Sequence, residues 1–198
     1  VETWDGFSWT ETTNVNTGRR GGAGSGDSSA SILIGGVNPA PSTGFTELWN
    51  GSSWTEVNDL NTARGNAAGS NAGTSTAALL ASGSPNLANT ESWNGTNWTE
   101  VNDLNTGRSD LGGAGTYTAM LVFGGDTTTT VANTESWNGT SWTEVNDLAT
   151  ARKTLAGAGG NTSGLGFGGV NPPSSTLAAT EEWSFSGLDP STTPAADY

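Results

Sequence analysis

Tryptophan is the side chain in this sequence that is best suited to bind a ligand, because it recurs in pairs five residues apart. The flat face of an indole can stack on the C–H surface of a sugar, and one pair per repeat could form one shallow carbohydrate site per repeat. A buried indole also contributes about 150 to 250 Å² of apolar area. Core packing is the favoured interpretation of Trp49, Trp93 and Trp137. For the second member of each pair both interpretations stay open, so the candidate ligand-binding tryptophans are Trp54, Trp98 and Trp142.

A glutamate and an arginine also recur in every repeat. Positions kept in all units are expected to hold the scaffold, whereas positions that vary are free for recognition. We therefore predict a repeated ion pair, or hydrogen-bonded clamp, between neighbouring units. A ring of arginines that binds anions is the alternative, and the formal net charge of −13 weakens it. The structural positions are Glu47, Glu91, Glu135 and Glu181 with Arg20, Arg64, Arg108 and Arg152.

Catalysis would have to use ionisable residues that break the repeat. Two carboxylates could act as the acid and base of a glycosidase, but no spacing singles out a pair. The sequence has no histidine and no cysteine, which excludes Ser-His-Asp triads, thiolate nucleophiles and ordinary zinc sites. We predict no enzyme activity, no catalytic residue, no metal site and no cofactor. The ionisable residues that break the repeat are Asp27, Asp110, Asp126, Lys153 and Glu182.

The balance of charges limits the possible partners. Only 6 Lys and Arg stand against 19 Asp and Glu. Phosphate binding needs clustered basic side chains, so we expect neither nucleic acid nor an anionic membrane surface as a partner. The longest apolar runs, such as residues 119–123, are too short to cross a bilayer. Few lysines combined with abundant Gly, Thr and Asn favour an extracellular location or the surface of a virion.

The elements that must position these side chains follow from the repeat itself. The tryptophans recur every 44 to 46 residues, which indicates an array of small supersecondary units. The units lie near residues 1–19, 20–63, 64–107, 108–151 and 152–185, and residues 186–198 are predicted to be a tail or linker. The tryptophans are Trp4/Trp9, Trp49/Trp54, Trp93/Trp98, Trp137/Trp142 and the single Trp183.

Each unit contains four predicted strands and no helical periodicity. In the unit that begins at Arg108, the strands are expected over residues 111–115, 117–125, 132–137 and 141–148. The Asn138-Gly139 dipeptide indicates a hairpin. A two-residue turn would place Trp142 opposite Glu135, and a four-residue loop would place it opposite Trp137. Both registers put the two tryptophans on one face of the hairpin.

Four short strands per unit predict an all-β fold, a β-propeller of about four blades with five as the alternative. The third full unit runs from Arg108 to LVFGG (121–125), ESW (135–137) and Trp142, and it resembles the kelch repeat. Trp137 stands where kelch repeats usually have Tyr, and the second unit has Ala-Ser-Gly (81–83) in place of a Gly-Gly doublet. The resemblance implies a kelch-like propeller and little about activity, since such propellers serve many functions.

The predicted strands number seventeen, one more than four blades need. Propellers commonly close their ring by pairing an N-terminal strand with C-terminal ones, and residues 7–12 could complete the last blade in this way. This closure within one ring is the favoured prediction. An incomplete fifth blade, a segment of a longer ring, and exchange of the N-terminal hairpin between chains in a homo-oligomer are the alternatives.

The loops between the second and third strands do not repeat: they read VNPAPSTG (37–44), SPNLA (84–88), DTTTTVA (126–132) and VNPPSSTLA (170–178). Since strands alternate in direction, these loops share one face of the propeller with the connections between blades. That face is the predicted recognition surface, although loops that merely tolerate change are an equal alternative. Its candidate ligand-binding residues are Asn38, Asn86, Asp126 and Asn171.

The function predicted from these features is a non-enzymatic interaction module of the adhesion type, with a protein or a cell-surface glycan as partner. Repeats of the WNGTSWTEV type (137–145) resemble those of virion and fibre-associated proteins of tailed phages and of surface proteins of aquatic microbes. The alternative is a propeller lectin with one shallow site per blade. A hydrolase that acts on glycans comes third.

Overall fold

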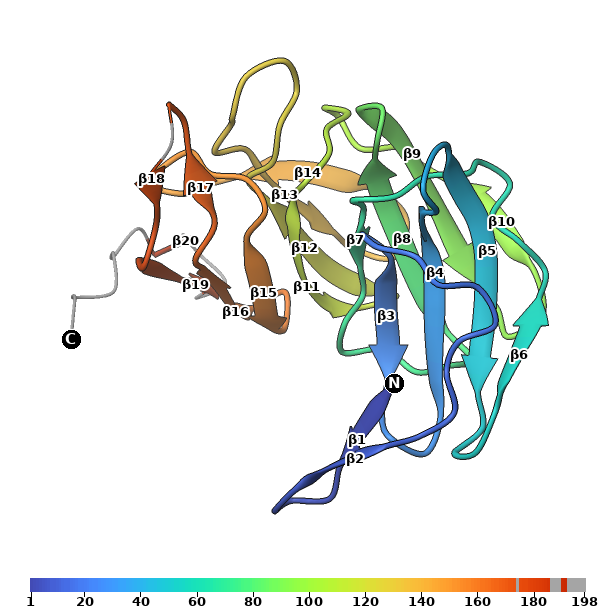
Figure 1. The fold of residues 1–198 in the computed structure, drawn as a ribbon. Helices are drawn as coiled ribbons and strands as arrows, with labels where there is room; N and C mark the ends of the chain where they lie inside the picture. Colours follow the sequence, from blue (N-terminus) through green and yellow to red (C-terminus); the bar gives the residue numbers. More distant parts are fainter. Residues whose placement is uncertain (174, 186–189, 192–198) are drawn as a thin grey trace.

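A computed structural model describes residues 1–173, 175–185 and 190–191 of the chain. Its four four-stranded antiparallel sheets are the blades of a β-propeller, and the described residues contain no helix (Figure 1). The predicted fold class, all-β with four blades, is confirmed. The predicted tail at 186–198 lies outside the described residues, except that Pro190–Ser191 form a short strand.

The blades follow one another along the chain, and the first strand of each lies against the first strand of the next. Blade 1 comprises β3 (Ala23–Gly26), β4 (Ser31–Val37), β5 (Ser42–Trp49) and β6 (Trp54–Val57), and blade 2 comprises β7 (Ala68–Gly69), β8 (Ala78–Gly83), β9 (Leu87–Trp93) and β10 (Trp98–Val101). Blade 3 comprises β11 (Gly112–Thr116), β12 (Ala119–Phe123), β13 (Thr134–Trp137) and β14 (Trp142–Val145), and blade 4 comprises β15 (Ala156–Gly159), β16 (Ser163–Phe167), β19 (Thr180–Phe185) and β20 (Pro190–Ser191). Blades 1 and 4 are the two ends of the series (Figure 1).

The outer hairpin of each of the first three blades shows why the WNG motif folds as it does. In blade 3, Trp137 pairs with Trp142, which is the register of the four-residue loop. The Asn138 side chain accepts hydrogen bonds from the backbone N–H groups of Thr140 and Ser141, each at 2.9 Å. Gly139 has a φ of 94°, a conformation that only glycine adopts without strain. The two indoles share one face with their ring centroids 5.2 Å apart.

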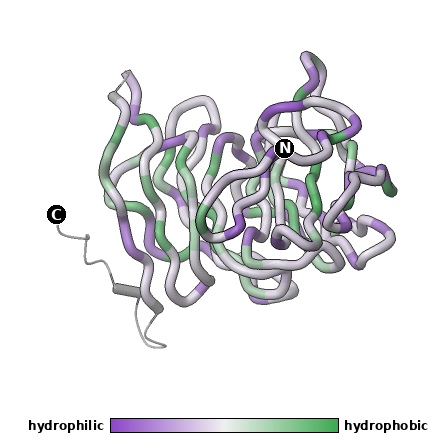
Figure 2. The backbone as a smooth tube through the Cα atoms, turned by 60° about the horizontal axis from the view of Figure 1, so that its bottom comes forward, coloured by the Kyte–Doolittle hydropathy of each residue, from purple (hydrophilic) through white to green (hydrophobic). Residues whose placement is uncertain are grey.

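Among the described residues the hydrophobic core consists of three clusters, one at each junction between consecutive blades. At the junction of blades 2 and 3, Leu79 and Ala81 of β8 pack in one cluster with Trp137 and Trp142 of blade 3. Ile32 and Ile34 pack with Trp93 and Trp98 in the same way at the previous junction. Figure 2 shows hydrophobic colour along the strands and hydrophilic colour mainly over the connections. Each blade is therefore stabilised chiefly by its neighbours.

The predicted ring closure is wrong. Residues 7–12 were expected to complete blade 4, but β2 (Trp9–Glu11) pairs with β1 (Glu2–Trp4) in a separate two-stranded sheet beside blade 1, and β20 pairs with β19. The connection that follows β2 is fixed to blade 1, because Thr13 donates to Ser52 and both Asn16 and Arg19 donate to Glu47. The hairpin thus lies at the opposite end of the series from blade 4 (Figure 1).

One more two-stranded sheet lies in a connection of blade 4, where β17 (Val170–Asn171) pairs with β18 (Ser175–Thr176). Within the described residues, no helix is long and apolar enough to cross a membrane.

Candidate functional site

The repeated glutamates and arginines form buried ion pairs across the blade junctions. Arg64 lies 2.5 Å from Glu91, and Arg108 lies 2.6 Å from Glu135, with the side chains at most 2% exposed. Arg152 pairs with Glu181 at the next junction. Each arginine follows the outer hairpin of one blade, and its glutamate lies on the third strand of the next blade. The pairs therefore join consecutive blades.

The first junction corrects the sequence prediction, which named Arg20. Arg19 makes the ion pair with Glu47, and its Nε donates to the carbonyl of Gly35 at 2.8 Å. Arg108 makes the same contact with Gly124 at 2.9 Å. Arg20 is exposed, and its backbone pairs with Val37 instead. Arg19, which is one residue nearer to the N-terminal hairpin than Arg20, is therefore the arginine that reaches the buried carboxylate of Glu47.

Further hydrogen bonds satisfy the carboxylate oxygens that do not contact the arginines. The second oxygen of Glu135 accepts from the backbone and side-chain nitrogens of Asn105 at 2.7 and 2.9 Å. Burial acts to raise the pKa of Glu47, but the hydrogen bonds from Arg19 and Asn16 outweigh it, and the pKa lies below its ordinary value. These charges are used for cohesion between blades.

The candidate ligand-binding tryptophans also lie at the junctions. Trp98 and Trp142 are each 6% exposed. Their indole N–H groups donate to the hydroxyls of Thr46 and Thr90 in the preceding blade, at 3.0 and 3.1 Å. Such burial leaves little indole face on which a sugar could stack. Trp54 is half-buried, and its buried Nε1 makes no hydrogen bond to any residue that the structure describes.

Two of the four candidate loop residues come together where blade 2 meets blade 3. Asn86 accepts a hydrogen bond from the Ser109 hydroxyl at 2.8 Å and donates to the carbonyl of Thr127. Ser109 and Asp126 exchange two backbone hydrogen bonds of 2.9 and 2.8 Å. Asn38 is half-buried in the connection after β4 of blade 1, and Asn171 lies in β17 beside blade 4.

Two ionisable residues that break the repeat complete this group, and sequence spacing did not predict that they would meet. Lys153 forms an ion pair with Asp126, with the two side chains 31% and 20% exposed. Burial raises the pKa of Asp110, Lys153 lowers it and Asp126 raises it further, so that the net shift is upward. A hydrogen bond to Asp126 raises the pKa of Lys153. We call Asn86, Ser109, Asp110, Asp126 and Lys153 the junction cluster.

The backbone holds the junction cluster at the connections between blades. The residue two positions after each of these ion-paired arginines has a positive φ, which is 53° at Asn66, 58° at Asp110 and 54° at Thr154. Asp110 donates its N–H to Asn66 at 2.9 Å, and Thr154 donates to Asp110 at 2.7 Å. This ladder ties the connections of successive blades together. The junction cluster is thus held on rigid backbone at the face that carries the variable loops, where it offers an amide, a hydroxyl, carboxylates and an ammonium group.

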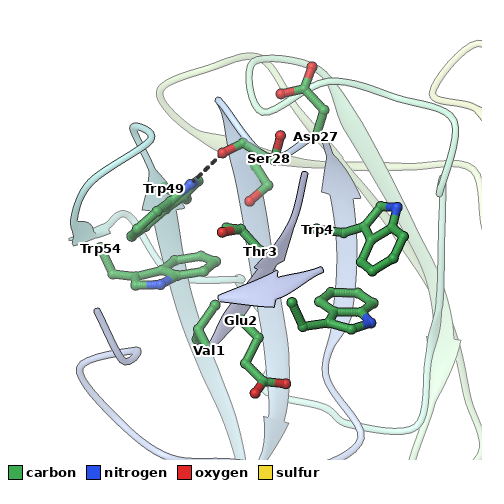
Figure 3. A pocket seen from close by; sticks show the side chains of 10 residues that line it. Val1, Glu2, Thr3, Trp4, Asp27, Ser28, Trp49 and Trp54 are labelled. Atoms are coloured by element: carbon green, nitrogen blue, oxygen red, sulfur yellow. Dashed lines mark hydrogen bonds between the residues drawn. The ribbon is translucent and has the colours of Figure 1, made fainter. Parts of the chain in front are cut away.

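A cavity of about 290 Å³ lies between the N-terminal hairpin and blade 1. Figure 3 shows Trp49 and Trp54 on one side of it and Trp4 on the other, with Val1, Glu2 and Thr3 between them. Sequence reasoning had named Trp54 but gave no sign of a cavity. The part of the chain that the structure describes contains no group of three or more His, Cys, Asp or Glu side chains able to hold a metal ion.

No protein-family model matches this sequence, and no curated protein matches it. Among solved structures, one described as "Structure of YjhT" superposes with a TM-score of 0.77 at 13% sequence identity. The match covers 93% of this chain and 72% of that chain. At this identity the likeness shows the propeller fold alone. The resemblance to kelch repeats and to virion proteins stays a prediction.

Proposed function

We propose that this propeller is a non-enzymatic interaction module of the adhesion type, located on a virion or another extracellular surface. The fold supports an interaction or binding role, and function has to be argued from the site that a fold carries. We place that site at the junction cluster.

The observation that carries the proposal is the division between repeating and non-repeating polar residues. The clamp arginines and glutamates are buried in ion pairs at the junctions. In contrast, Asp110, Asp126 and Lys153, which break the repeat, lie together and are partly exposed. The Asp126–Lys153 pair also links blade 3 to the connection into blade 4, but unlike the buried ion pairs it is partly exposed and is made by residues that do not recur. Polar groups that are gathered on a rigid scaffold and left accessible are the usual means by which a protein recognises a ligand.

The chemistry of the junction cluster favours a neutral or cationic polar partner. The chain has a formal net charge of −13, so an anionic surface would be repelled. Asp110 and Asn86 can exchange hydrogen bonds with a protein side chain or with the hydroxyls of a glycan. Lys153 is neutralised by Asp126, and this pair would add a donor and an acceptor in fixed positions.

A binding assay with matched variants tests this proposal. Labelled protein is applied to a glycan array and to a panel of intact microbial cells. The double variant Asp126→Asn/Lys153→Met removes both charges, and a partly exposed pair contributes only about 0 to 1 kcal/mol to stability, so the fold should persist. We expect its binding to fall about tenfold or more, which corresponds to about 1.4 kcal/mol. The control is Asp27→Asn, which changes an exposed carboxylate in the turn between β3 and β4.

Unchanged binding by the double variant, or no binding to any surface tested, would contradict the proposal. Glycan binding that is lost in folded Trp98→Ala and Trp142→Ala variants but kept in the double variant would favour the lectin. Turnover of a polysaccharide by the purified chain would overturn the non-enzymatic assignment.

A further inference from the structure

We infer that Asn71 is a positioning residue for the junction cluster, because its side chain holds the first strand of blade 4 against the first strand of blade 3. Asn71 belongs to residues 70–72, a segment of the connection between β7 and β8 that hydrogen-bonds to all four blades. We call residues 70–72 the inner bridge. The inference rests on the proposed function, since it concerns the site proposed there.

Ser70 fixes the inner bridge to blades 1 and 2. Its carbonyl accepts a hydrogen bond from the Ser25 hydroxyl of β3 at 2.8 Å. Its own hydroxyl accepts one from the backbone N–H of Leu79 in β8 at 2.9 Å. Both serine side chains are buried. The inner bridge therefore starts from the packed interface between the first two blades.

Asn71 and Ala72 extend the inner bridge to blades 3 and 4. The Ala72 N–H donates to the carbonyl of Gly115 at 3.0 Å, and the Asn71 Oδ1 accepts from the Gly115 N–H at 3.3 Å. The Asn71 Nδ2 donates to the carbonyls of Gly113 in β11 and Gly157 in β15, at 2.9 and 2.7 Å. One side chain thus bonds to the first strands of two other blades, 42 and 86 positions further along the sequence.

The amide of Asn71 stabilises a close approach of β11 and β15. The two backbones nearly touch, because a Cβ added to Gly157 would lie 2.3 Å from the carbonyl oxygen of Gly113. The carbonyl oxygens of Gly113 and Gly157 both accept from one NH₂ group, whose two donors satisfy them together. An aspartate at position 71 would have the same shape but no donor, and its carboxylate would repel both carbonyls.

The junction cluster lies where the same two strands begin. Lys153 comes three residues before β15, and Asp110 comes two residues before β11. The backbone of Lys153 exchanges two hydrogen bonds with Val170, so this lysine is fixed to blade 4. Its partner Asp126 follows β12 of blade 3. The Asp126–Lys153 ion pair therefore depends on how closely blade 4 lies against blade 3, which is the spacing that Asn71 holds.

The connection that contains the inner bridge is longer than its counterparts in the other blades. The connection between the first and second strands covers residues 70–77 in blade 2, against 27–30, 117–118 and 160–162 in blades 1, 3 and 4. The extra length lets Asn71 reach β15 from blade 2. This segment departs from the repeat as the variable loops do, but its hydrogen bonds join blades.

Acetylation of Lys153 tests the inference without a partner, because the chain has a single lysine. The ion pair with Asp126 favours the protonated ammonium, and only the neutral amine attacks an acetylating reagent. The intact chain is treated with an acetic acid N-hydroxysuccinimide ester, and acetylated Lys153 is quantified by peptide mass spectrometry. Asn71→Asp should speed the reaction about twofold to fivefold, a modest change because a partly exposed ion pair is weak.

The matched control is Asn58→Asp. The Asn58 Nδ2 donates to the Thr96 carbonyl and to the Asn97 side chain at 2.9 and 2.8 Å, so it joins blades 1 and 2 as Asn71 joins the others. Its variant should acetylate at the wild-type rate. Asn71→Ala removes the amide without adding a charge and should also speed the reaction. Both asparagines are exposed, and circular dichroism checks that each variant is folded.

Equal acetylation rates in wild type and both Asn71 variants would overturn the inference. An increase in Asn58→Asp as large as that in Asn71→Asp would overturn it as well, because the effect would then be a general loosening of the fold. On a surface that the wild-type chain binds, Asn71→Asp should also bind more weakly than Asn58→Asp. Faster acetylation of the Asn71 variants of a chain that binds no surface would support the positioning role and contradict the proposed function.

Discussion

Trp142 and Trp9 occupy the same position of the same outer hairpin, yet one is 6% exposed and the other 64%. The motifs around them, SWTEV (141–145) and SWTET (8–12), are almost identical. The difference arises outside the motif, because Trp142 has blade 2 against its face and Trp9 has no blade there in the described residues. In a repeat protein the energetic role of a residue is set by the neighbouring unit as much as by its own.

The largest expected difference in stability between an internal junction and a chain end is at an arginine–glutamate ion pair. Arg108→Met should cost about 3 to 5 kcal/mol of unfolding free energy, because it leaves the Glu135 carboxylate buried without its partner. The matched change Arg20→Met should cost less than about 0.5 kcal/mol, since the Arg20 side chain is exposed. Urea unfolding followed by tryptophan fluorescence measures both. Equal losses would mean that Arg20 contributes a contact that the structure does not show.

A second pair of variants compares the apolar faces of β12 and β16. Leu121→Ala should destabilise the chain by about 2 to 5 kcal/mol, because Leu121 is fully buried between blades 3 and 4. Leu165→Ala, at the equivalent position of β16, should cost less than about 1 kcal/mol, because Leu165 is 40% exposed. If Leu165→Ala were as damaging as Leu121→Ala, Leu165 would be buried by a contact that the structure does not describe.

The sequence alone was sufficient to predict how the interior blades of the propeller are built. The 44- to 46-residue spacing and the Asn-Gly loops set the blades, and the alternation along the hairpin placed Trp137 and Trp142 on one face in either register. The structure then selected the four-residue loop. Three of the four predicted strands of blade 3 were longer than the observed ones, because their end residues belong to the connections, and the first was displaced by one residue.

The arrangement of the N-terminal hairpin and of the junction cluster could not be derived from the sequence in the same way. One residue at the end was within reach of the sequence, because Arg19 follows Trp9 by ten residues, as Arg64 follows Trp54 and Arg108 follows Trp98. The repeat spacing therefore identifies Arg19, and not Arg20, as the partner of Glu47. Closure by residues 7–12 was plausible from strand number, but the pairing of β1 with β2 and the anchoring of Asn16 on Glu47 hold the hairpin beside blade 1. The meeting of Asp126 with Lys153 depends on how blade 3 is set against blade 4, a relation that no local pattern encodes.

A smaller effect distinguishes two equivalent indole N–H groups. Trp142→Phe and Trp54→Phe remove the same ring atoms, but only Trp142→Phe also removes a hydrogen bond, the one to Thr90. It should therefore cost about 1 to 2 kcal/mol more than Trp54→Phe, whose N–H makes no hydrogen bond within the described residues. The residue equivalent to Thr46 and Thr90 in the hairpin is Val1, which has no hydroxyl. Val1→Thr should therefore stabilise the chain by about 1 kcal/mol. Thermal and urea unfolding of the three variants check this, and a neutral Val1→Thr would show that Val1 does not face Trp54 as its equivalents face their tryptophans.

The smallest expected effect is a dependence on pH at the first junction. The pKa of Glu47 is lower in the folded chain than its ordinary value of 4.5, mainly because the hydrogen bonds from Arg19 and Asn16 outweigh burial. A lowered folded pKa means that the unfolded chain binds the proton more readily, so the contribution of Glu47 is complete above about pH 4.5 and is lost as the pH falls through the folded pKa. Urea midpoints between neutral pH and about pH 3 should fall less steeply for Glu47→Gln than for wild type, although the variant is less stable at neutral pH because Arg19 loses its partner. The control Thr55→Ala, which changes an exposed side chain of β6 that does not titrate, should follow the wild-type slope. Parallel slopes for Glu47→Gln and wild type would contradict a lowered pKa at this clamp.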